Sequence, residues 1–158
     1  MKRFLIPLLA AIALPTAVNA EVTNDYIFKS DQAHKLISEG KYSEAETICD
    51  ELIEISPDNP NSYICKGIAL GFASENKKKR KAVRNFTKAI KIDPESNEAY
   101  FFRGILQFTI RRREDSGTAR RACNDMARAY FNNYPPALEY FKNNKSFVKG
   151  ECYQFIRE

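Results

Sequence analysis

One short stretch, from Ala82 to Pro94, places the strongest constraint on how this chain folds. Ala82, Phe86 and Ala89 recur at helical spacing, so they form a stripe of two small side chains around one ring. Small side chains let a second helix approach closely, and the ring fills the space between the helices. The helix is predicted to end at Asp93, because proline disfavours a helical residue before it. A helix of this kind needs neighbours that cover its stripe.

Related stripes lie on both sides of this stretch, which indicates a repeat. Their members are Ala45, Cys49, Leu52 and Pro57 before it, and Ala122, Met126, Ala129 and Pro135 after it. The prolines at positions 57 and 94 are 37 residues apart, as are the glycines at positions 67 and 104. A repeat of amphipathic helices predicts an all-α chain in which consecutive helices cover one another.

Helix pairs at this period resemble the tetratricopeptide repeat, whose unit is about 34 residues. The resemblance rests on four segments: Gly40-Lys41-Tyr42-x-x-Ala45, Tyr63-x3-Gly67, Tyr100-x3-Gly104 and Ala82-x3-Phe86-x2-Ala89-x4-Pro94. The chain departs from the family in having no tryptophan, and in placing Lys66 and Arg103 where an apolar residue is expected before the glycine. The resemblance implies a short α-α superhelix of about three helix pairs over residues 29–134, followed by a capping helix and tail over residues 135–158.

The first 20 residues have the features of an export signal. Lys2 and Arg3 precede an apolar run that is too short to span a bilayer, and Val18-Asn19-Ala20 offers small residues for cleavage. We therefore predict a cleaved signal over residues 1–20 and a polar lead-in over residues 21–28. The expected location is the periplasm or another envelope lumen (the thylakoid lumen in a photosynthetic cell), or the exterior. No stable membrane insertion is expected after cleavage.

Four cysteines allow three disulfide pairings, and an even number is typical of exported proteins. Cys49 and Cys65 lie on helices predicted to pack against each other, at similar distances from the turn between them. We predict the pairs Cys49–Cys65 and Cys123–Cys152. No C-x-x-C pair occurs and His34 is the only histidine, so neither a metal nor another cofactor is expected, and enzyme activity is not expected either.

The first helices of the second and third units each carry an apolar stripe. In the resembling family these helices line a concave, peptide-binding surface. The corresponding residues are Ile64, Ile68, Phe72, Phe101, Ile105 and Phe108. Such a stripe is rarely left bare, so two interpretations stand: a partner binds it, or the C-terminal helix and tail cover it from within.

Two clusters of basic residues are predicted to lie in breaks between helices, on one edge of the superhelix. They comprise Lys77, Lys78, Lys79, Arg80, Arg111, Arg112 and Arg113. This basic edge could meet acidic protein, anionic lipid or another polyanion, or could simply be solvated. Nucleic acid is not expected, because no aromatic residue is interleaved with the lysines.

The sequence therefore favours a non-catalytic module that binds a peptide or helix of a partner protein, with the basic edge selecting acidic partners. A binder of anionic lipid or polyanion is the main alternative, and an unrecognised hydrolase is the other. Salt dependence would separate the lipid or polyanion binder from the peptide binder, because contacts to phosphate weaken steeply with ionic strength.

Overall fold

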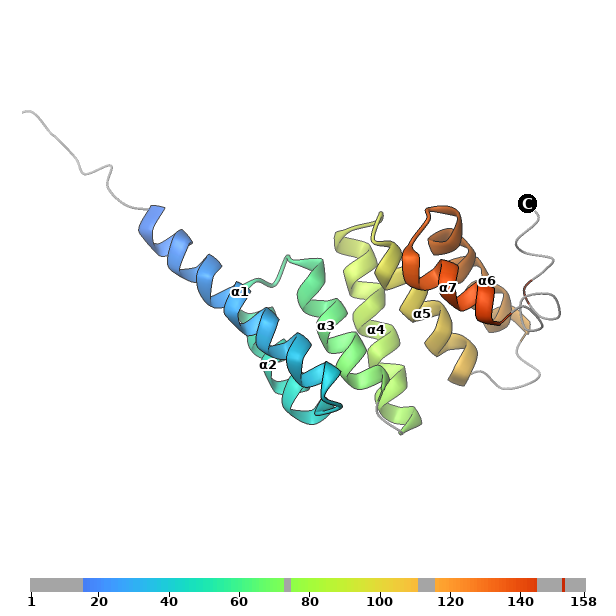
Figure 1. The fold of residues 1–158 in the computed structure, drawn as a ribbon, viewed down its shortest axis with the longest axis horizontal. Helices are drawn as coiled ribbons and strands as arrows, with labels where there is room; N and C mark the ends of the chain where they lie inside the picture. Colours follow the sequence, from blue (N-terminus) through green and yellow to red (C-terminus); the bar gives the residue numbers. More distant parts are fainter. Residues whose placement is uncertain (1–15, 73–74, 111–115, 145–151, 153–158) are drawn as a thin grey trace, which may run out of the picture.

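A computed structural model describes residues 16–72, 75–110, 116–144 and Cys152, and within these ranges the chain is entirely helical. The helices are α1 (Thr16–Ser38), α2 (Tyr42–Ile55), α3 (Pro60–Gly71), α4 (Asn76–Ile92), α5 (Asn97–Ile110), α6 (Ser116–Phe131) and α7 (Pro135–Asn143). Each helix packs against the next one in sequence, so the helices succeed one another along the long axis of the molecule (Figure 1). This confirms the all-α prediction.

The turns between helices follow from local chemistry. Gly40, between α1 and α2, has a φ of +74°, a left-handed conformation that glycine adopts without steric penalty. Asn59 caps α3 by accepting a hydrogen bond from the Asn61 backbone N–H at 3.0 Å, and Pro60 occupies the first turn. Asp93 ends α4 and accepts a hydrogen bond from the Glu95 N–H at 2.9 Å. These signals confirm the predicted helix ends near residues 40, 57 and 94.

The stripe on α4 is buried as predicted, since Ala82, Phe86 and Ala89 are all 0% exposed. The ring of Phe86 lies directly on Gly67 of α3, where an added Cβ would come within 2.7–2.9 Å of three ring carbons. Gly67 therefore allows the close approach of α3 and α4. The same core continues into α5 through Ala99 and Leu106.

Both predicted disulfides are present in the structure. Cys49 of α2 pairs with Cys65 of α3, with their Cα atoms 5.7 Å apart, and Cys123 of α6 pairs with Cys152, at 5.3 Å. No described cysteine is free. Two disulfides indicate an oxidising environment, as expected of an exported protein.

Two sequence predictions of local structure are corrected. Residues 21–28 are helical and belong to α1, because nothing between Thr16 and Ser38 is a strong helix stop. Lys77 to Arg80, predicted as a break, form the first turns of α4, which begins at Asn76, since lysine and arginine are good helix formers. Residues 1–15 lie outside the described ranges, and with them the apolar run of the predicted signal.

Candidate binding groove

The apolar stripe on α3 is partly open to solvent. Ile64 is buried in the core shared with α4 and α5, which corrects its prediction as a groove residue. Ile68 is half-buried against the same core, and Phe72, just after the last turn of α3, is 56% exposed. The Phe72 ring stacks on Tyr42 of α2, with centroids 5.5 Å apart and planes within 11°. Phe72 is thus exposed, yet it is held in one orientation.

A cavity of about 250 Å³ opens beside this stripe, between α3, α4 and α5. Its walls are almost wholly apolar, and within the described ranges Lys79 of α4 is the only charged side chain that lines it. The lining residues are Gly67, Ile68, Gly71, Phe72, Lys79, Phe86, Phe102, Ile105, Leu106 and Thr109. We call this cavity the α3–α5 pocket. Three predicted groove residues, at positions 68, 72 and 105, meet in it.

The stripe on α5 is covered from within over much of its length. Phe101 is only 4% exposed, and its ring meets Tyr134 and Tyr140 edge-on at 5.7 and 5.8 Å. Ile105 and Phe108 pack against the cluster of Cys123, Met126, Phe141 and Cys152. For Phe101 the prediction of an exposed groove residue is therefore corrected, because α7 covers it.

A second, shallower cavity of about 320 Å³ lies between α5 and α7. Its lining residues are Phe101, Ile105, Pro136, Glu139, Tyr140, Asn143 and Asn144. Ile105 also lines the α3–α5 pocket, so the two cavities meet at this side chain. We call the second cavity the α5–α7 depression, and both together the groove.

Several groove residues were missed by sequence reasoning. Lys79 was assigned to the basic edge, yet it lines the α3–α5 pocket. Gly71 also lines the pocket, but Leu106 lies against it as Phe86 lies against Gly67, so the spacing of the two glycines indicates close helix packing and does not predict the pocket. Phe102 and Leu106 lie beside the predicted stripe rather than on it, so the stripe pattern did not find them.

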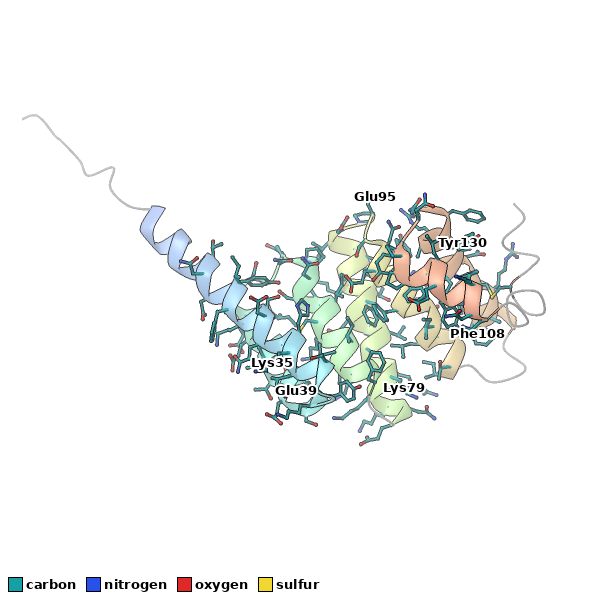
Figure 2. The ribbon with its side chains drawn as sticks, in the orientation of Figure 1. Lys35, Glu39, Lys79, Glu95, Phe108 and Tyr130 are labelled. Carbon is teal, nitrogen blue, oxygen red and sulfur yellow. A yellow bond between two sulfur atoms is a disulfide. The ribbon has the colours of Figure 1, made fainter. Side chains whose placement is uncertain are left out.

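The part of the basic edge that the structure describes lies at the start of α4. Figure 2 labels Lys79 near the first turns of α4, and Phe108 toward the end of α5. Lys78 forms an ion pair of 3.4 Å with Glu46 of α2. The side chains of Lys77, Lys79 and Arg80 make no ion pair with a described residue. The three arginines at positions 111–113 lie outside the described residues.

Glu98, in the first turn of α5, is a half-buried carboxylate near the other end of the groove. It lies on the same helix face as Phe101 and Ile105, three and seven residues further on. Burial raises the pKa of the Glu98 carboxyl above its ordinary value, and the charge of His34 acts in the opposite direction. Burial also raises the pKa of Tyr134 to about 12, and the nearby Glu98 carboxylate adds to that rise.

Within the described parts of the chain, no group of three or more metal-ligating side chains comes together. His34 is exposed on α1. Across the same ranges, no helix combines the length and the apolar character needed to cross a membrane. No protein-family model matches the sequence, and no curated protein matches it significantly.

Proposed function

We propose that this chain is a non-catalytic protein-interaction module that binds an apolar peptide or helix of a partner protein in the groove. In this proposal α1 to α6 form three helix pairs of the tetratricopeptide type, and α7 caps them. The packing of consecutive helices and the contact of Phe86 with Gly67 support this arrangement. The two disulfides support export to an oxidising compartment, for which we propose the periplasm or a similar envelope lumen.

The observation that carries the proposal is the α3–α5 pocket. A cavity of this size, with apolar walls and an exposed ring at its edge, can accept one large apolar side chain of a partner. The pocket is preformed, because Phe72 is stacked on Tyr42 and because the Cys49–Cys65 disulfide ties α2 to α3. A preformed pocket loses little conformational entropy on binding.

The start of α4 supports a preference for acidic partners. Apart from Glu75 at the N-cap, its first two turns carry only bases among their charged residues. The helix dipole disfavours cations at this end, and like charges four residues apart, such as Lys77 and Lys81, repel each other. An acidic partner would relieve both unfavourable interactions.

The proposal is tested with two phenylalanines of matched exposure, Phe72 at 56% and Phe131 of α6 at 55%. Only the first lines the pocket. The probe is a phage-displayed library of random 12-residue peptides, selected on the wild-type protein. We expect enriched peptides whose binding falls at least tenfold with Phe72→Ser and persists with Phe131→Ser. A selection without enriched peptides, or equal losses in both variants, contradicts the proposal.

The bases at the start of α4 also favour a second candidate function, the binding of anionic lipid. Here the probe is a vesicle of phosphatidylglycerol, compared with one of phosphatidylcholine. Replacement of Lys77, Arg80 and Lys81 by glutamine would abolish co-sedimentation with the anionic vesicles, and Phe72→Ser would not change it. Binding would also weaken steeply with salt. This combination of results would favour the lipid binder over the peptide binder.

A further inference from the structure

The groove has one charged side chain in each of its two cavities, and the two charges are opposite. Among the residues that the structure describes, Lys79 is the only charged one that lines the α3–α5 pocket, and Glu139 is the only charged one that lines the α5–α7 depression. Neither side chain makes an ion pair or a hydrogen bond with a described residue. Ile105 lies between them, because it lines both cavities.

The residues around each cavity extend this separation of charge. Lys77, Arg80 and Lys81 lie within two residues of Lys79 in the sequence and add to the positive charge at the start of α4. Glu98 lies on the groove face of α5 and is half-buried without a hydrogen bond or ion pair to a described residue. Lys142 is the only base of α7, in its last turn, and it does not line the depression, while the charge of His34 of α1 acts on Glu98. The groove is therefore positive on the α4 side and negative on the α7 side.

We propose that the groove binds its partner segment in one direction, with an acidic residue beside Lys79, an apolar side chain in the pocket next to Ile105, and a basic residue beside Glu139. This inference rests on the proposed function and adds the chemistry and polarity of the partner. A segment bound in the opposite direction would place like charges together at both ends of the groove, so its binding would be weaker.

The geometry sets the spacing of the two charges in the partner. Packed helices lie about 8–10 Å apart. α5 and α7 meet through side chains such as Phe101 and Tyr140, so the path from α4 across α5 to α7 covers at least roughly two such distances. An extended chain advances about 3.3 Å per residue, so the acidic and basic residues are separated by at least about five residues. The occupant is thus a short peptide segment with the order acidic, apolar, basic.

The test begins with the peptides enriched by the wild-type protein, which are expected to share this order. Two synthetic peptides are then compared. The first has an enriched sequence, and the second has the same sequence with its acidic and basic residues exchanged. Fluorescence anisotropy should show about tenfold tighter binding of the first peptide to the wild type. A double variant, Lys79→Glu with Glu139→Lys, keeps the net charge and should prefer the exchanged peptide.

The matched control is a charge swap outside the groove, Lys91→Glu with Glu54→Lys. Both residues are exposed, on α4 and α2, and neither lines a groove cavity. This variant should keep the wild-type preference. Melting curves of both double variants should match that of the wild type, because surface charges contribute little to stability.

The outcomes separate the two proposals. A selection without enriched peptides overturns the proposed function and this inference with it. Enriched peptides that need Phe72 but bind equally with their charges exchanged overturn the inference alone. A third outcome is that the enriched peptides resemble a stretch of this chain and that the protein forms a dimer which the double variant dissociates. That result would assign the groove to a second copy of the chain and would also overturn the inference.

Discussion

The stripes on α3 and α5 have similar helical spacings in the sequence, i, i+4, i+8 and i, i+4, i+7, but different surroundings in the structure. On α3, Phe72 is 56% exposed and the α3–α5 pocket opens beside it. On α5, Phe101 is 4% exposed and lies under Tyr134 and Tyr140. The difference comes from α7, which lies over the α5–α6 end of the array (Figure 1). Both stripes begin with a buried residue, Ile64 and Phe101, but the stripe on α3 ends in the exposed ring of Phe72.

An array of helices explains why the two stripes differ. In the proposed array, each helix pair buries one face on the pair before it and one on the pair after it, so the last pair needs a cap. In the proposed arrangement α7 is this cap, and the disulfide with Cys123 adds Cys152 to the same cluster. α3 lies inside the array and needs no cap, so part of its stripe stays available.

The largest expected difference between the two stripes is in how much each contributes to the free energy of unfolding. Phe101→Ala should lower the free energy of unfolding by about 3–5 kcal/mol, because it leaves a cavity under α7. Phe72→Ala should lower it by about 1 kcal/mol or less, because the ring is more than half exposed. Urea unfolding of both variants measures the difference. Equal losses would show that α7 does not cover Phe101 in solution.

The second comparison concerns two basic residues, Arg103 and Lys66, each of which directly precedes a glycine of its helix. Arg103 of α5 forms two hydrogen bonds, of 2.7 and 2.8 Å, with Asp125 of α6, and these side chains are only 18% and 11% exposed. Lys66 of α3 pairs with Asp50 of α2, whose side chain is 48% exposed. Each base therefore bridges neighbouring helices, in a shielded place on α5 and a more solvated one on α3.

Replacing these two bases should affect stability unequally. Arg103→Met leaves a buried carboxylate without its partner and should lower the free energy of unfolding by about 1–3 kcal/mol. Lys66→Met should change it by less than about 1 kcal/mol, as exposed ion pairs contribute little. Adding Asp125→Leu to Arg103→Met should recover part of the loss, since the unpaired charge is gone. Denaturant unfolding of the three variants measures this order, and a lack of recovery would contradict it.

Much of the fold was predictable because its signals are local. Gly40 and the prolines at positions 57 and 94 mark helix ends, and the Ala82–Phe86–Ala89 stripe marks a buried face. The pairing of Cys49 with Cys65 follows from the geometry of two adjacent helices joined by a short turn. Each of these inferences needs only neighbours in sequence.

The open and covered parts of the groove could not be predicted in this way. Whether Phe101 is exposed depends on where α7 docks after the turn at Tyr134, and this is decided by aromatic contacts between α5 and α7. Lys79 was placed on an edge because a run of bases resembles a loop, whereas its helical conformation turns it toward the pocket. Long-range packing decided both outcomes.

The smallest effect concerns Glu98, which lies near the covered end of the groove. Burial raises its pKa above the ordinary value of 4.5, so the folded protein holds this proton more tightly than the unfolded chain does. Below pH 4.5 the carboxyl is protonated in both states and has no effect. As the pH rises through the ordinary value and then through the raised one, the unfolded chain ionises first, so the folded state loses stability that it does not regain at higher pH.

Glu98→Gln removes this ionisation and should therefore raise the melting temperature at pH 7, with the gain disappearing at pH 3.5. Glu54→Gln is the matched control, because Glu54 is exposed on α2 and forms no ion pair with a described residue. It should leave the melting temperature nearly unchanged at both pH values. Thermal unfolding followed by circular dichroism measures all four cases. A gain in melting temperature for Glu98→Gln that persists at pH 3.5 would assign the effect to packing of the amide. A lower melting temperature at pH 7 would show that the surroundings of Glu98 stabilise the ionised carboxylate, and that burial is not the dominant effect on it.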